Sequence, residues 1–161
     1  GLKPIRLLLL GLSDDPIEPG FFQRGVERNA NNTDGILGAY ATAMIEHGGP
    51  DAVVTLVNNH LKDKTLPSIS REMLTEALAI HSSAADAETR ETIQRTMDAA
   101  IREDPELASM VARHFGARYD WSQSEAISDL MHSGTVKSPI EMLLLTQYVS
   151  LAQDNPAQIP N

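Results

Sequence analysis

Apolar residues recur along this chain with the three-to-four-residue spacing of helices, and no alternating strand pattern follows residue 20. The stripes over residues 36–45 and 53–61 are examples, and residues 139–152 are the most apolar stretch. Glycine and proline divide the pattern into pieces of roughly 10 to 17 residues, the usual length of globular helices. The pattern predicts an all-α fold of about seven short helices, arranged as an irregular bundle or as an α-solenoid-like array of helical hairpins.

Glycine and proline also mark where helices begin and end. A short helix is expected over residues 21–29, before a polar break. Thr33 or Asp34 can cap the next helix, and Gly48 is placed to end it in the left-handed conformation. Pro50 then opens another helix, because proline is tolerated in a first helical turn.

Three later helix starts carry side-chain caps. Asp104 precedes a proline, which predicts a capping residue followed by the first helical position. Ser122 and Glu125, like Ser138 and Glu141, have the spacing of a capping box, in which the serine accepts from a free backbone N–H and the glutamate reaches back. These signals predict helices that begin near residues 105, 123 and 139.

The order of the helices leaves the choice between bundle and array open. Alternate helix starts fall about 35 residues apart, which is the spacing of stacked helical hairpins. Helices of about 12 residues joined by loops of about 5 produce the same rhythm, and the residues themselves do not repeat with it. We therefore favour the irregular bundle.

We expect three regions along the chain. Residues 1–20 form an apolar segment and a loop rich in proline and glycine, residues 21–153 form a single all-α domain, and residues 154–161 form a flexible tail. Residues 3–12 are short and apolar enough for a helix or a buried strand. No signal peptide or membrane span of about 18 apolar residues is recognised, so we expect a soluble cytoplasmic domain of a larger protein or complex.

The amino-acid composition limits which catalytic sites, metal sites and partners the chain can have. The 161 residues include no cysteine, which excludes disulfides, thiolate metal sites and a cysteine nucleophile. The net charge of −9 disfavours nucleic acid and anionic membranes as main partners. Nucleophile-elbow and phosphate-loop motifs are absent, so no catalytic residue and no cofactor are expected.

The five histidines lie in or near the last turns of the expected helices. None has the spacing of a metal-binding pair, so no metal site is expected. A cation at a helix C-terminus is stabilised by the helix dipole. The pattern therefore predicts histidine pKa values above the ordinary value.

Candidate binding residues are those that protein interfaces favour, aromatic side chains and arginine. The adjacent rings of Phe21 and Phe22 cannot both face one core, so one of them packs on the N-terminal apolar segment or meets a partner. Arg118, Tyr119 and Trp121 cluster between two expected helices. The apolar helix over residues 139–152 is expected to be the central helix, and docking of a partner on one of its sides is the alternative.

Trp121 and Glu125 also form a Trp-x-x-x-Glu pattern. The pattern resembles the signature of bacterial effectors that activate host Rho-type GTPases. The resemblance covers five residues, and the catalytic loop of that family is not found in this chain. It implies delivery into a host cell and nucleotide exchange on a GTPase, without a cofactor.

The sequence thus favours a non-catalytic domain that binds a partner protein. The candidate binding residues are Phe21, Phe22, Arg118, Tyr119, Trp121 and Glu125. The alternatives are a bacterial effector domain that acts on a host regulator and a metal-free helical enzyme.

Overall fold

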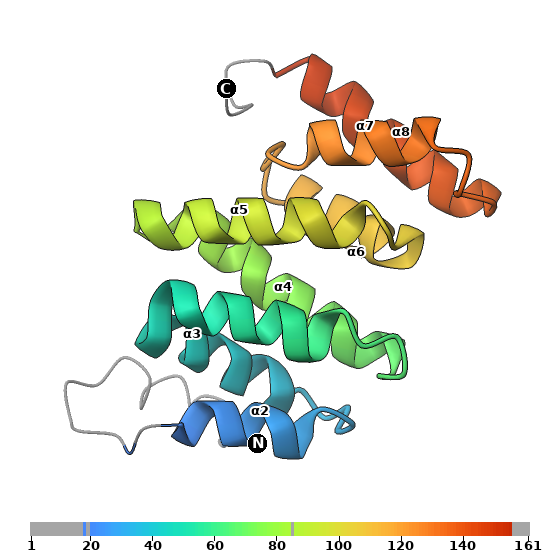
Figure 1. Cartoon of the computed structure of the whole chain (residues 1–161). Coiled ribbons are helices and arrows are strands. Elements are labelled where there is room, and N and C mark those ends of the chain that lie inside the picture. The colour runs from blue at the N-terminus through green and yellow to red at the C-terminus, as the bar shows by residue number, and fades with distance from the viewer. Residues whose placement is uncertain (1–17, 19, 85, 156–161) are drawn as a thin grey trace. The chain divides into compact units, whose positions relative to one another are not determined.

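The computed structural model describes residue 18, residues 20–84 and residues 86–155. Every regular element in this part of the chain is helical, which confirms the predicted all-α class (Figure 1). The elements are α2 (Phe21–Asn29), α3 (Ile36–Leu56), the π-helix η1 (Val57–Leu61), α4 (Ser68–Ala84), α5 (Ala87–Ile101), α6 (Pro105–Gly116), α7 (Ser124–His132) and α8 (Pro139–Gln153). The apolar segment 3–12 and the end of the expected tail, 156–161, lie outside the described residues.

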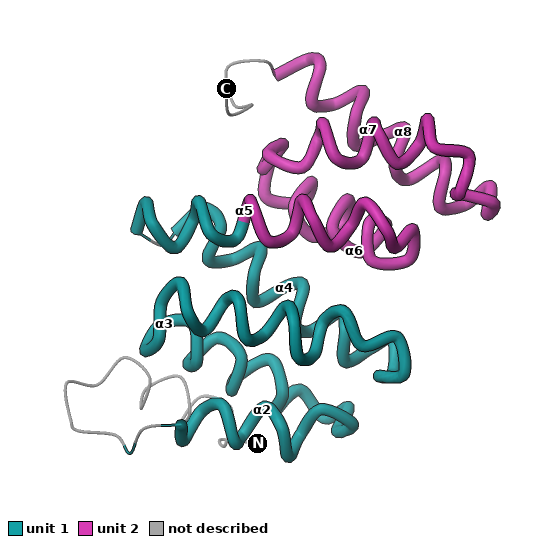
Figure 2. Tube along the Cα trace, viewed as in Figure 1, with its two compact units in different colours: residues 1–93 teal, residues 94–161 magenta. Residues whose placement is uncertain are grey.

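The chain divides into two compact units, Gly1–Ile93 and Gln94–Asn161 (Figure 2). The expected domain over residues 21–153 extends across both units. Unit 1 is built on α3, which packs against α2 on one side and α4 on another. In unit 2, α6 and α7 both pack against α8. Each unit has its own buried apolar residues, such as Leu37 and Leu74 in unit 1 and Phe115 and Leu145 in unit 2.

A glycine allows the close approach of α2 to α3. Gly25 is buried on α2, and a Cβ added there would lie 2.1 Å from the ring of Tyr40. The ring of Tyr40, itself buried, therefore lies directly on the backbone of α2. Phe22, one turn earlier, is buried and its ring meets His47 edge-on at a centroid distance of 5.5 Å.

The break inside α3 falls one residue later than the sequence predicts. Gly49, not Gly48, has the positive φ, with φ 60° and ψ −139°. Pro50 explains the shift, because the proline ring disfavours the α conformation of the residue before it. Only glycine adopts the resulting backbone geometry without strain. The helix then resumes and ends in the π-helical turn η1, in which the Lys62 N–H donates to the Val57 carbonyl at 3.0 Å.

The predicted caps have mixed outcomes. Asp104 and Ser138 cap α6 and α8, because their side chains accept from the Leu107 and Glu141 N–H groups at 3.2 and 3.3 Å. The capping box at Ser122 is wrong: α7 begins after Gln123, and the Ser122 hydroxyl oxygen is buried with no hydrogen-bond partner among the described residues.

The start of α3 also differs from the prediction by one residue. Gly35 occupies the cap position with φ 91°, and the Asp34 carboxylate accepts from the Ile36 N–H at 3.0 Å. The aspartate therefore still satisfies a free donor at the helix start, from one position further out.

The close contact between α2 and α3 predicts that Gly25→Ala destabilises unit 1. The new methyl group would overlap the Tyr40 ring, so we expect unit 1 to lose about 2–3 kcal/mol of stability. Urea unfolding followed by circular dichroism, with hydrogen exchange of the α2 and α3 amides, measures the loss.

Gly38→Ala is the matched control for this change. Gly38 also lies inside a helix, but among the described residues its added Cβ would meet only Met73, at an ordinary 3.8 Å. Alanine there should stabilise the chain by about 0.5–1 kcal/mol through its higher helix propensity. Equal effects of the two substitutions would contradict the described packing of α2 on α3.

Candidate functional site

The last helix, α8, is apolar on two faces, and the fold covers only one of them. Leu145, Tyr148 and Ala152 are buried against α6 and α7. On the other side Ile140, Leu143 and Leu151 have exposed fractions of 73%, 67% and 43%. The predicted central helix is therefore wrong in one respect, because α8 contacts both neighbouring helices but leaves an apolar face open. We call Ile140, Leu143, Leu144, Gln147 and Leu151 the outer face of α8.

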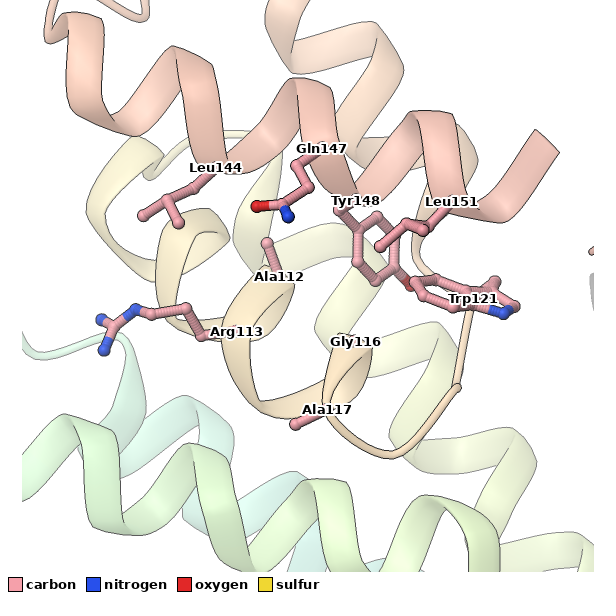
Figure 3. Close-up of a pocket in the computed structure, with 9 residues that line it drawn as sticks. All are labelled: Ala112, Arg113, Gly116, Ala117, Trp121, Leu144, Gln147, Tyr148 and Leu151. Carbon is pink, nitrogen blue, oxygen red and sulfur yellow. The ribbon is translucent and has the colours of Figure 1, made fainter. Parts of the chain in front are cut away.

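A groove runs along this outer face, between α6 and α8 (Figure 3). Its volume is about 200 Å³. Small residues of α6 line one side and the outer face of α8 lines the other, with an aromatic pair at one end. The lining residues are Ala112, Arg113, Gly116, Ala117, Trp121, Leu144, Gln147, Tyr148 and Leu151. Pockets for small molecules usually measure roughly 300–1,000 Å³, so this groove is better matched to one or two apolar side chains.

Tyr148 ties α8 to the corner between α6 and α7. Its hydroxyl donates to the Asp120 carbonyl at 2.7 Å and accepts from the Gln123 N–H at 3.2 Å. Its ring meets Trp121 edge-on at a centroid distance of 5.2 Å. Burial raises the pKa of the Tyr148 hydroxyl well above its ordinary value, so the hydroxyl keeps the proton that it donates. The tie therefore fixes which face of α8 points inward.

The same corner holds a strained and exposed aromatic residue. Tyr119 has φ 57° and an exposed fraction of 73%. The Asp120 N–H donates to the Phe115 carbonyl and the Tyr119 N–H to the Gly116 carbonyl, the pair of bonds of a Schellman motif. Glycine normally occupies the left-handed position of that motif, and another residue there costs about 1–2 kcal/mol. Strain of this kind is found more often at functional sites than elsewhere.

The structure places the predicted candidates in separate settings. Trp121 is 2% exposed and lines the groove, while Arg118 and Tyr119 are exposed and follow the groove residue Ala117 in the chain. Glu125 is exposed in the first turn of α7.

The two phenylalanines lie in unit 1, where they take part in the packing of α2. Phe22 is buried, and Phe21 is half-buried with its ring 6.3 Å from that of Tyr40. Packing of either ring on the N-terminal apolar segment involves residues outside the described part of the chain.

Sequence reasoning missed the residues that complete the site, above all Leu144, Gln147, Tyr148 and Leu151. The available signal was the spread of apolar residues of 139–152 over more than one face of a helix. It indicated the docking alternative, but sequence alone does not show how much of such a helix its neighbours cover.

His60 does not behave as the helix-dipole argument predicts. Burial lowers the pKa of His60 below its ordinary value, and this effect outweighs the nearby carboxylates of Glu27 and Asp63. The Nε2 atom of His60 is buried without a hydrogen-bond partner among the described residues. In the part of the chain that the structure describes, no three histidine or carboxylate side chains are grouped to hold a metal ion.

No protein-family model matches the chain, and no curated protein or solved structure is significantly similar to it. None of the described helices combines the length and apolar character needed to cross a membrane.

Removing the Tyr148 hydroxyl tests the tie between α8 and the corner. In Tyr148→Phe the buried Gln123 N–H loses its acceptor and the Asp120 carbonyl loses a donor. We expect unit 2 to lose about 2 kcal/mol of stability. Denaturant unfolding followed by the fluorescence of Trp121, the only tryptophan, reports on this unit directly.

Tyr119→Phe is the control for that experiment, because Tyr119 lies in the same unit and its side chain is exposed to solvent. A loss below about 0.5 kcal/mol is expected for it. If Tyr148→Phe costs no more than Tyr119→Phe, the tie does not hold α8 in place.

The strain at Tyr119 predicts a substitution that stabilises the protein. Tyr119→Gly should raise the stability of unit 2 by about 1 kcal/mol, since glycine adopts a positive φ without strain. The reverse change is Gly134→Ala, at a position with φ 79° where an added Cβ would have no close neighbour among the described residues, and it should destabilise by a similar amount. Trp121 fluorescence during unfolding measures both changes. If Tyr119→Gly destabilises the protein, the packing of the Tyr119 ring contributes more stability than the strained backbone costs.

Proposed function

We propose that this chain is a non-catalytic protein-interaction domain of a larger protein or complex, and that the outer face of α8 binds an amphipathic helix of a partner protein. The observation that carries the proposal is the exposure of Ile140, Leu143 and Leu151 on one side of a single helix. Isolated exposed apolar residues are ordinary on a protein surface, whereas a row of them beside a groove marks an interaction site.

A helical partner fits the spacing of the outer face. Ile140, Leu143, Leu144, Gln147 and Leu151 occupy positions i, i+3, i+4, i+7 and i+11, so they form one stripe along the helix. Helices bind such stripes with their own apolar residues at positions i, i+3, i+4 and i+7. The groove beside Leu144 and Leu151 then takes a side chain of the partner as an anchor.

The α6–α7 corner supplies the edge of the same surface. Tyr119 and Arg118 are exposed there, next in the chain to Ala117 and close in the chain to Trp121, which line the groove. Tyrosine and arginine are enriched at the energetic centres of interfaces. The GTPase-effector and metal-free enzyme alternatives stay predictions from the sequence.

Selection of peptides from a random library tests the proposal and does not require an identified partner. The purified whole chain is used to select displayed 16-residue peptides. Wild-type protein should enrich peptides with apolar residues at helical spacing, and Leu143→Lys should weaken their binding at least tenfold, measured by calorimetry. Because Leu143 is 67% exposed, the substitution should leave folding intact, which circular dichroism checks.

Ile69→Lys is the matched control. Ile69 is an apolar residue of α4 in unit 1 with an exposed fraction of 50%, and it lies outside the outer face of α8. It should leave peptide binding unchanged. The proposal fails if no helical pattern is enriched, if the selected peptides bind Leu143→Lys as well as wild type, or if the wild-type chain covers this face by associating with itself.

A further inference from the structure

A second cavity, in unit 1, is lined largely by polar groups and lies away from the outer face of α8 in the chain. Its volume is about 190 Å³. The polar side chains that line it are Glu46, His81, Asp86 and Thr89, and the remaining lining residues are Ile45, Gly49 and Ala84. Glu46 belongs to α3 and His81 to α4, so the cavity lies where these two helices meet.

Both ring nitrogens of His81 have a hydrogen-bond partner, and the contact at Nε2 joins α4 to α3. Nδ1 lies 2.8 Å from the carbonyl oxygen of Ala77, one turn earlier on α4. Nε2 lies 2.9 Å from Oε1 of Glu46 on α3. The side chain of His81 is only 3% exposed, whereas that of Glu46 is 42% exposed.

Both atoms that face the imidazole nitrogens of His81 are hydrogen-bond acceptors, so they determine how many protons the His81–Glu46 pair must hold. A carbonyl oxygen only accepts, so Nδ1 must carry a hydrogen. A neutral ring has one hydrogen, which would leave a lone pair on Nε2 facing the lone pairs of an ionised carboxylate at 2.9 Å. The contact between His81 and Glu46 therefore needs one further proton, held on either partner.

The charged groups that line the cavity favour an extra proton on the His81–Glu46 pair. Asp86 is the other carboxylate that lines the cavity, and no lysine or arginine lines it in the described part of the chain. Asp86 accepts from the Thr89 N–H at 3.0 Å and from its hydroxyl at 2.9 Å. These bonds lower the pKa of Asp86, so it stays negative near neutral pH and attracts positive charge to the cavity.

We propose that Glu46 and His81 form a proton-dependent latch between α3 and α4, closed when the pair holds its extra proton and opened when the proton is lost. Stability linked to such a proton is present at low pH and declines as the pH rises. The latch thus loosens the C-terminal turn of α4 toward alkaline pH.

His60, in the same unit, acts in the opposite direction. Its pKa is lowered by burial, so its contribution to stability is lost as the pH falls. A pH titration of the wild-type protein alone would mix the two effects. Each variant is therefore compared with wild type at the same pH, which cancels the contribution of His60.

Glu46→Gln separates the latch from other pH effects. The glutamine amide can donate to a neutral Nε2, so the contact no longer needs the extra proton. Hydrogen-exchange protection of the α4 amides from Leu78 to Ala84 is measured in the full chain at pH 6 and pH 8. Relative to the variant, wild type should lose protection on the order of tenfold between the two values.

Glu76→Gln is the matched control, because Glu76 is an exposed carboxylate of α4 that does not line this cavity. It should follow wild type at both pH values. A wild-type loss of protection that persists in Glu46→Gln would overturn the proposal.

Nitrogen-15 spectroscopy of the wild-type imidazole gives an independent test that needs no variant. At pH 6 the His81 ring should show protonated Nδ1 together with Nε2 that is protonated or in a strong hydrogen bond, and at pH 8 Nε2 should have the shift of a bare nitrogen. A bare Nε2 at pH 6, or spectra that do not change, would overturn the latch.

Discussion

The position of the Tyr148 hydroxyl determines what unit 2 can offer to a partner. By bonding to Asp120 and Gln123, it holds α8 with Leu145 and Ala152 inward. A helix that is apolar on two faces has no strong preference of its own for which face to bury. The polar tie supplies that preference, because turning α8 would leave buried groups at the corner without partners. The exposure of the outer face is thus a consequence of the tie.

How far the sequence predicts the fold depends on whether a signal acts within one turn or across the structure. Asp104 and Ser138 were predictable as caps, because a cap bonds to an amide three residues away. Ser122 has the same local pattern, but its hydroxyl makes no such bond. The chain path there is set instead by the packing of Trp121 on Tyr148 and by the Tyr148 hydroxyl, which lies 25 residues along the chain from its partner Gln123. The break at Gly49 is an intermediate case, in which Pro50 decides between two adjacent glycines.

The candidate site follows the same division. The aromatic and arginine residues of the corner could be selected from the sequence by residue type, and Tyr119 and Arg118 are indeed exposed. Which residues of α8 complete the surface depended on the helix's orientation, which no periodicity encodes when both faces are apolar. The same limit applies to His81, whose position in a helix predicted a dipole interaction, while its partner Glu46 lies 35 residues earlier in the chain.

Energetics indicate why the outer face of α8 would act together with the corner. Full burial of one leucine or isoleucine side chain is worth roughly 1.5–3 kcal/mol, so covering the exposed parts of Ile140, Leu143 and Leu151 would yield about 4 kcal/mol. A micromolar complex needs about 8 kcal/mol after the entropic cost of association is met. The three side chains alone do not reach that value. An anchor in the groove and the ring of Tyr119 are the contacts available to supply the remainder, and a binding role of this kind would account for a tyrosine where the backbone favours glycine.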